Sequence, residues 1–130
     1  WIYIQINKGM YGLPQSGKLA NDLLRQRLAP HGYHPCQHTP GLWRHNCKPI
    51  SFVLVVDDFA VKFVNKTDVL DLLAILQAHY TVKVDWTAST FCGIHFDWDY
   101  PNRLVHLTMP GYIDSFLDEI KHPQPAKAQN

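Results

Sequence analysis

The sequence predicts an α+β fold, in which helices and antiparallel strands share one domain. Two observations carry this prediction. Leucines recur at helical spacing within residues 16–28, and residues 51–64 form two β-rich runs joined by a two-residue polar step. The length of 130 residues suits one compact domain, and the apolar (46%) and charged (18%) fractions are those of a globular chain. Both main helices are expected on one face of the sheet.

The first half of the chain is expected to lead from an extended segment into a helix. Residues 1–6 alternate weakly between apolar and polar positions and predict a strand or an extended lead-in. The helix is predicted at residues 16–28, with Ser16 as its N-cap. Residues 31–49 contain three prolines and scattered histidines, so they predict a loop with at most a short strand at residues 42–43.

The second half of the chain is expected to contain most of the sheet. Its first run, residues 51–56, is apolar throughout, which predicts a strand buried at the centre of a sheet. The elements that follow are predicted in this order: the returning strand of that hairpin over 59–64, a helix over 68–79, a strand over 80–84, a second hairpin over 91–107, and a helix over 112–120. Residues 122–130 carry two prolines and no apolar pattern, so they are linker-like.

The adjacent acids Asp57 and Asp58 are the clearest chemical feature. At a hairpin turn two neighbouring carboxylates can converge at the end of a sheet, where their repulsion raises a pKa or demands a cation. Mg²⁺ is the natural partner, since it prefers carboxylate oxygen and keeps coordination positions for phosphate. In nucleotidyl transfer two such ions, about 3.5–4 Å apart, stabilise both the attacking and the leaving oxygen. A surface type I′ turn, in which Asp tolerates positive φ, explains the same pair without a metal.

Charge is distributed unevenly along the chain. Residues 1–50 hold six Lys or Arg against one acid, and residues 51–130 hold six against ten. A basic half beside an acidic half suits an enzyme that holds a polyanion near metal-binding carboxylates, although surface charge scattered by chance is the simpler explanation. The three cysteines are irregularly spaced, as expected of free thiols in a reducing compartment.

Membrane insertion and secretion are not expected from the sequence. No apolar run approaches the roughly 20 residues that span a bilayer, and the N-terminus has no secretory signal. The chain opens with Trp1 in place of a methionine, so it is expected to be an internal piece of a longer protein.

Four short stretches resemble motifs of copia-type retrotransposon reverse transcriptases. Residues 10–16 (MYGLPQS) resemble the "LYGLKQ" stretch of that family, and residues 55–59 (VVDDF) resemble its "YVDD" hairpin. Residues 91–94 (FCGI) are similar to "FLGI", and residues 107–113 (LTMPGYI) are similar to "LSQ..YI". The four occur in the family's order and with similar gaps, over roughly residues 3–120. One such motif is weak, whereas four in register are specific.

The resemblance implies a right-hand polymerase fold. Residues 1–86 would be a partial palm, an antiparallel βαββαβ-like sheet with helices on one face and its first strand missing. Residues 87–110 would be the primer-positioning hairpin, and residues 111–130 the start of the thumb with a linker. The implied activity is that of an RNA-directed DNA polymerase, which extends a DNA primer on an RNA or DNA template with deoxynucleoside triphosphates.

The resemblance also assigns roles to residues. Asp57 and Asp58 would be the catalytic pair that binds two Mg²⁺ ions, and Lys83 would be the general acid that helps pyrophosphate leave. Three residues would border the incoming nucleotide and template: Tyr11, Gly12 and Gln15. Three more would position the primer: Phe91, Cys92 and Gly93. The implied partners include the rest of the pol polyprotein with its RNase H, and the implied location is intracellular, in a cytoplasmic virus-like particle or the nucleus.

The sequence departs from the family pattern at three points. The first metal-binding aspartate of the family lies on a strand upstream of the "YGL" stretch, so the third Mg²⁺ ligand is expected before Trp1. Two carboxylates without the third should bind Mg²⁺ weakly, and the fragment alone is expected to be inactive. Val55 stands where the family has an aromatic residue, and Cys92 stands in place of Leu.

Three other interpretations remain open from the sequence. Residues 12–18 match the P-loop pattern G-x-x-x-x-G-K, but Leu19 follows where a Ser or Thr hydroxyl should reach Mg²⁺. A zinc module is a second interpretation, although the single-residue gaps between its ligands are tighter than usual; its ligands would be His34, Cys36, His38, His45 and Cys47. A decayed, non-catalytic nucleic-acid-binding remnant is the third.

Overall fold

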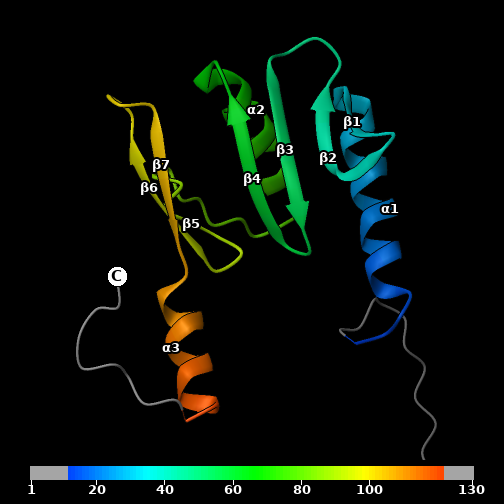
Figure 1. Ribbon diagram of the computed structural model, residues 1–130. Coiled ribbons are helices and arrows are strands. Elements are labelled where there is room, and N and C mark those ends of the chain that lie inside the picture. Colours follow the sequence, from blue (N-terminus) through cyan, green and yellow to red (C-terminus); the bar gives the residue numbers. More distant parts are fainter. Residues whose placement is uncertain (1–11, 122–130) are drawn as a thin grey trace, which may run out of the picture. The chain divides into compact units, whose positions relative to one another are not determined.

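Two antiparallel sheets and three α-helices make up the α+β architecture, so the predicted fold class is confirmed (Figure 1). The structure is a computed structural model that describes residues 12–121. The chain divides into two compact units, residues 1–84 and 85–130. The lead-in predicted at residues 1–6 and the linker predicted at 122–130 lie outside the described residues. Among the described helices, none combines the length and apolarity of a membrane span.

Helix α1 spans Ser16–Leu28, as predicted, but its N-cap is Gln15 and not Ser16. Gln15 already has helical backbone angles, φ −81° and ψ −13°, so Ser16 lies inside the first turn and no side chain caps the helix. A short 3₁₀ helix, η1 (Ala29–His31), continues α1 and ends at Gly32, whose φ of +84° is the left-handed conformation favoured for glycine after a helix.

The segment predicted as a loop forms two paired strands, β1 (Tyr33–Cys36) and β2 (Thr39–His45), so that prediction is wrong. Its prolines do not prevent pairing because they lie where a backbone donor is not needed. Pro35 is in β1, which is the edge strand of its sheet, and Pro40 precedes the part of β2 that pairs with β3.

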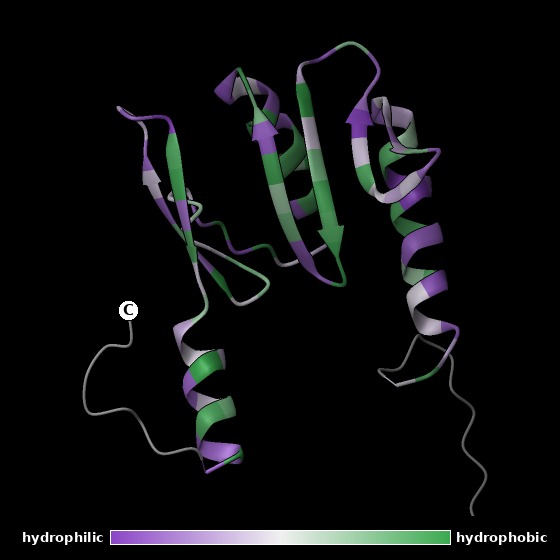
Figure 2. Cartoon of the chain, in the orientation of Figure 1, coloured by the Kyte–Doolittle hydropathy of each residue, from purple (hydrophilic) through white to green (hydrophobic). Residues whose placement is uncertain are grey.

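The predicted central hairpin is confirmed as β3 (Ile50–Val55) and β4 (Asp58–Phe63), in a sheet of order β1-β2-β3-β4. The apolar run of β3 is not buried on both faces, contrary to the prediction. Phe52 is buried, whereas Val53 and Val55 on the opposite face are 37% and 42% exposed. Figure 2 shows that this strand is apolar over most of its length. Its second set of apolar side chains therefore forms an open face of the sheet.

Both helices of unit 1 pack on the other face of this sheet, as predicted. Helix α2 (Lys66–Gln77) begins two residues earlier than expected. Trp43 of β2 stacks on Phe52 of β3 with ring centroids 5.5 Å apart and planes 13° from parallel. The core cluster also takes in buried side chains from α1, β1, β3 and α2: Leu24, Leu28, Tyr33, Ile50, Val69, Leu72 and Leu76. This one-sided core determines which face of the sheet remains open.

Unit 2 contains a three-stranded sheet and a helix. Strands β5 (Thr90–Phe91), β6 (Ile94–Asp99) and β7 (Leu104–Thr108) pair in sequence order, and α3 spans Pro110–Glu119. The hairpin predicted over 91–107 is present as β6 and β7, but a tight turn at its start separates the short strand β5 from β6. The strand predicted at 80–84 is absent from the described structure, because that segment has no strand partner there despite its β-branched composition.

Two leucines of α1 give a matched test of this core. Leu28 is fully buried and Leu19 is 55% exposed, although both belong to the apolar face predicted from sequence. We expect Leu28→Ala to lower the free energy of unfolding of unit 1 by about 2–5 kcal/mol, because it removes buried contacts and leaves a cavity. The control Leu19→Ala should change it by less than about 0.5 kcal/mol. Urea denaturation followed through NMR resonances of unit 1 measures both, and equal effects would contradict the assigned core.

Candidate active site

The turn that carries the acidic pair is shifted by one residue from the predicted position. Val55 pairs directly with Asp58, so the two turn residues are Val56 and Asp57. Asp57 therefore lies in the turn, and Asp58 is the first residue of β4. Both side chains are exposed. The backbone thus brings the two carboxylates to the end of the sheet, as the sequence predicted, one from the turn and one from the strand.

Positive φ does not explain the two aspartates. Val56 has a φ of +55°, whereas neither Asp57 nor Asp58 is among the residues with positive φ. A positive φ at only the first central residue is the pattern of a type II′ turn, which favours glycine there, not the type I′ pattern considered above. Valine is an unfavourable residue in this conformation, since its branched Cβ crowds the backbone. The explanation of the pair as φ-tolerant turn residues is therefore wrong.

Asp58 belongs to the open face of the sheet. Cross-strand partners share a face, and side chains alternate along a strand. Asp58 lies opposite Val55, and Ala60 lies opposite Val53, so these four residues occupy the face away from α1 and α2. Lys62 follows on the same face of β4 and is exposed. An acid at the strand end and a base further along are thus presented to the same side.

Two carboxylates make an incomplete metal site. Within residues 12–121 no group of three or more His, Cys, Asp or Glu side chains is placed to hold a metal ion. Asp57 and Asp58 could contribute two ligands, and a further carboxylate would be needed to hold a pair of Mg²⁺ ions firmly.

The zinc module is not supported either. The loop histidines and cysteines do not form a ligand cluster among the described residues. Instead, Nδ1 of His45 accepts hydrogen bonds from the backbone N–H groups of Cys47 (3.1 Å) and Lys48 (3.0 Å). One of the two ring nitrogens of His45 is therefore engaged in local hydrogen bonds and is not available to a metal.

The residues predicted to border the nucleotide lie before α1. Tyr11 is outside the described residues. Gly12 has a φ of +89°, and Gln15 is the N-cap of α1, whose N-terminal end lies toward the same end of unit 1 as the β3–β4 turn (Figure 1). The P-loop interpretation is not supported, because every strand pair of the described sheets is antiparallel and Lys18 pairs with Asp22 at 3.2 Å.

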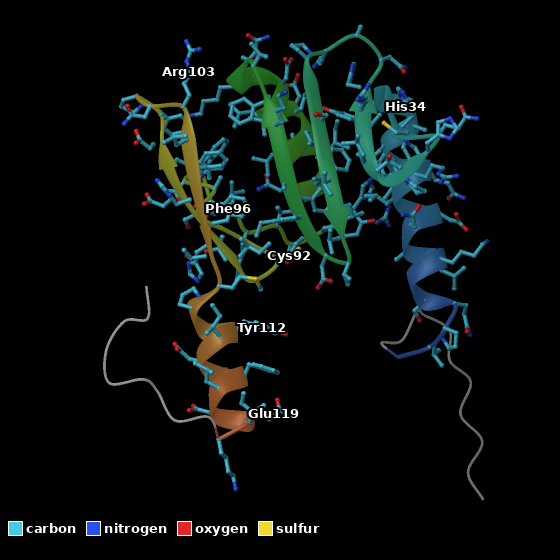
Figure 3. The ribbon with its side chains drawn as sticks, viewed as in Figure 1. His34, Cys92, Phe96, Arg103, Tyr112 and Glu119 are labelled. Atoms are coloured by element: carbon cyan, nitrogen blue, oxygen red, sulfur yellow. The ribbon has the colours of Figure 1, made fainter. Side chains whose placement is uncertain are left out.

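The residues predicted to position the primer form a tight turn in unit 2. Phe91 pairs with Ile94, and Cys92 and Gly93 make the connection with φ values of +50° and +79° (Figure 3). Two positive φ values are typical of a type I′ turn. Lys83, the predicted general acid, is exposed in a segment without regular structure between α2 and unit 2. The functional roles of these four residues stay predictions.

An aromatic row follows the turn along β6. The rings of Phe96, Trp98 and Tyr100 stack in series, with centroids 5.7 and 5.9 Å apart and planes within 13° of parallel. The indole N–H of Trp98 donates to the carbonyl oxygen of Ala88 at 2.9 Å, which fixes the central ring. Tyr100 is the most exposed of the three, so the end of the row is accessible for stacking.

Sequence reasoning missed two polar arrangements. One is the contact between the rings of Tyr33 and His45, together with the ion pairs of Lys48, in the segment predicted as a loop. Trp43 and His45 are two residues apart and so would share one face of a strand, which is the signal that could have indicated β2. The other is Asp85, which opens unit 2. Its carboxylate accepts hydrogen bonds from the hydroxyl and N–H groups of both Thr87 and Ser89.

No family model matches the chain, and no solved structure matches it.

Replacing Val56 by glycine tests the assigned conformation of the β3–β4 turn. We expect Val56→Gly to raise the free energy of unfolding of unit 1 by about 1 kcal/mol, because glycine adopts positive φ without steric cost. Val64→Gly is the control, since Val64 is also exposed but has no positive φ. It should give no stabilisation. Urea denaturation measures both, and destabilisation by Val56→Gly would contradict the assigned turn.

The hydrogen bonds that Asp85 accepts from Thr87 and Ser89 predict a pH-dependent change in stability. The Thr87 hydroxyl, followed by the N–H groups of Thr87 and Ser89, lowers the pKa of Asp85 from 3.8 to about 2. Because the ionised form is favoured in the folded state, this stabilisation is present above pH 3.8 and is lost as the pH falls through about 2. An NMR titration should give a pKa of about 2, reported also by the Thr87 and Ser89 amides. Asp85→Asn should abolish that transition. Persistence of the transition in this variant would contradict the hydrogen bonds assigned to Asp85.

Proposed function

We propose that this chain is part of an RNA-directed DNA polymerase that resembles copia-type reverse transcriptases, and that Asp57 and Asp58 hold its catalytic metal ions. The observation that supports this most strongly is the antiparallel hairpin with an exposed carboxylate in its turn and another on the open face of its sheet. A polymerase needs this combination, since the metal ligands must face a surface that can receive a nucleic acid. The finer assignment to a polymerase palm belongs to the same proposal.

In this proposal the two carboxylates act as metal ligands and not as proton carriers. Bound there, two Mg²⁺ ions would activate the 3′-hydroxyl of the primer and neutralise charge on the leaving pyrophosphate. Asp57 and Asp58 fix the place where the primer end and the triphosphate meet. Lys62, on the same face, is suited to contact a backbone phosphate.

The third carboxylate is proposed to come from an upstream strand. Strand β4 is, like β1, an edge strand of the described sheet, so its outer edge offers backbone groups for another strand. A strand that ends in an aspartate and pairs there would bring this carboxylate beside Asp58. The site would then have the three acids that a pair of Mg²⁺ ions requires, and the fragment without that strand would be inactive.

Other parts of the chain are proposed to hold the substrates. Tyr11, Gly12 and Gln15 would border the template and the incoming deoxynucleotide. The turn at Cys92 would position the primer, and the aromatic row on β6 would stack on bases. The remaining partners are the thumb and RNase H of the pol polyprotein, and the expected setting is a virus-like particle or the nucleus.

Replacing the acidic pair tests the proposal in the full-length polymerase. We expect Asp57→Asn or Asp58→Asn to reduce primer extension by about a thousandfold, because each removes a metal ligand whose ion contributes several kcal/mol to the transition state. Extension of a labelled primer on an RNA template, with Mg²⁺ and deoxynucleotides, measures the rate. Asp118→Asn, which alters an exposed acid on α3, is the matched control and should retain activity.

The fold of each variant must be checked in the same preparation. Circular dichroism and thermal unfolding should be unchanged in the Asp57 and Asp58 variants, since both side chains are exposed and lie outside the core. Full activity after both replacements would end the proposal.

A further inference from the structure

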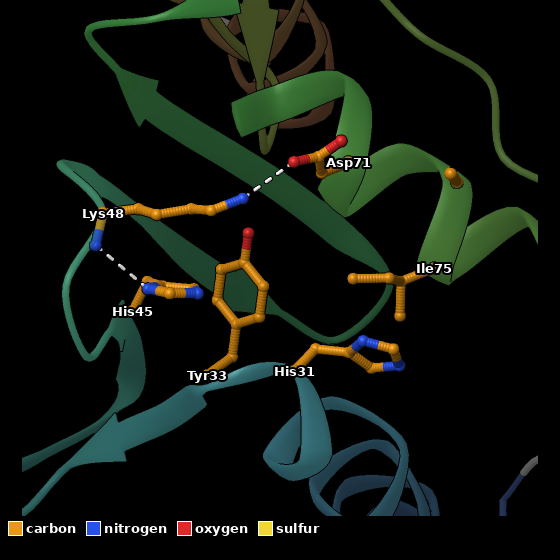
Figure 4. Close-up of a pocket in the computed structure, with 7 residues that line it drawn as sticks. His31, Tyr33, His45, Lys48, Asp71 and Ile75 are labelled. Carbon is orange, nitrogen blue, oxygen red and sulfur yellow. Dashed lines mark hydrogen bonds and ion pairs between the residues drawn. The ribbon is translucent and has the colours of Figure 1, made fainter. Parts of the chain in front are cut away.

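A cavity of about 350 Å³ lies between α2 and the first strands of unit 1, on the helix side of the sheet. It is lined by residues of η1, β1, β2, the following loop and α2: His31, Tyr33, His45, Lys48, Asp71, Ala74 and Ile75 (Figure 4). Its volume falls within the range of small-molecule sites, roughly 300–1,000 Å³. The Asp57-Asp58 site lies on the open face, so this cavity is separate from it.

The Tyr33 hydroxyl is the polar group that most needs a partner in this cavity. The side chain is 2% exposed, and its hydroxyl has no hydrogen-bond partner among the described residues. Figure 4 shows the hydroxyl directed toward the ends of Lys48 and Asp71. Burial raises the pKa of Tyr33, so the group is a neutral O–H donor at physiological pH. Buried hydroxyls in folded proteins are nearly always hydrogen-bonded.

His45 contributes a second donor. Its Nδ1 accepts from the N–H groups of Cys47 and Lys48, so the neutral ring carries its proton on Nε2. The ring packs edge-on against Tyr33, with centroids 4.8 Å apart. Gly32 lies beside this nitrogen, since a Cβ at that position would come within 3.0 Å of Nε2, and His45 itself lines the cavity. Two N–H or O–H donors therefore border the cavity from adjacent rings.

The charges around the cavity disfavour an anion. The ammonium of Lys48 lies 2.7 Å from Asp71 and 3.6 Å from Asp68, so one positive charge faces two carboxylates. An anion would have to compete with both for Lys48. A cation such as an ammonium carries no lone pair, so it could not accept from Tyr33 and His45. A neutral acceptor satisfies these donors without disturbing the ion pairs, while Ala74 and Ile75 supply an apolar wall.

We propose that this cavity binds a small, neutral, planar molecule with a carbonyl oxygen or ring nitrogen that accepts from Tyr33 and His45. Its flat body lies against Ala74 and Ile75. Because the cavity involves neither Asp57 nor Asp58, the proposal stands or falls independently of the polymerase assignment.

Three probes of nearly equal size separate the ligand classes: benzamide is neutral, benzoate is an anion and benzylammonium is a cation. Each is titrated into the ¹⁵N-labelled full chain. We expect benzamide to give saturable shifts at residues 31–48 and 71–75, with nuclear Overhauser effects to the methyl groups of Ala74 and Ile75. Benzoate and benzylammonium should bind more weakly.

Tyr33→Phe keeps the buried ring and removes only the hydroxyl, so it should fold and should weaken benzamide binding about five- to tenfold. Tyr112→Phe, which removes a hydroxyl in unit 2, is the control and should not change binding. Tightest binding of the anion or the cation would overturn the proposed ligand class. Absence of saturation with every probe, as expected if only water satisfies Tyr33, would overturn the site, and so would equal binding by Tyr33→Phe.

Discussion

The stacking of Trp43 on Phe52 is the interaction on which unit 1 depends, because it joins β2 to β3 on the face that receives both helices. Aromatic side chains bury a large apolar area, and a parallel offset pair adds to that burial. The register of the sheet follows from it, since a shift of one residue would turn Phe52 to the other face. Once Phe52 faces the helices, Val53 and Val55 must face away.

The placement of the acidic pair is a consequence of that register. Asp58 pairs with Val55 and therefore shares the open face, where its side chain is exposed. The turn itself is unfavourable at Val56, since a β-branched residue occupies positive φ. Leu54 and Phe59, which pair with each other just beyond the turn, are half-buried and pack against the core.

Polar groups at the opposite face are organised by α2. Lys48, from the loop between β2 and β3, forms ion pairs with two acids of that helix. His45 fixes the same loop through two backbone hydrogen bonds. Lys48 thus connects the loop to α2, and His45 connects it to the end of β2. Tyr33 lies at the base of the cavity between α2 and these strands.

The sequence by itself determined the elements with strong local patterns. Leucine spacing located α1, and two β-rich runs around Asp57-Asp58 predicted the hairpin that carries both acids. Tertiary structure decided the rest. Strands β1 and β2 form despite their prolines because an edge position requires fewer backbone donors, and Leu19 stays exposed although it has the same spacing as buried Leu28. Periodicity indicates which residues share a face, but only packing decides which face is covered, and so where Asp58 and Tyr33 point.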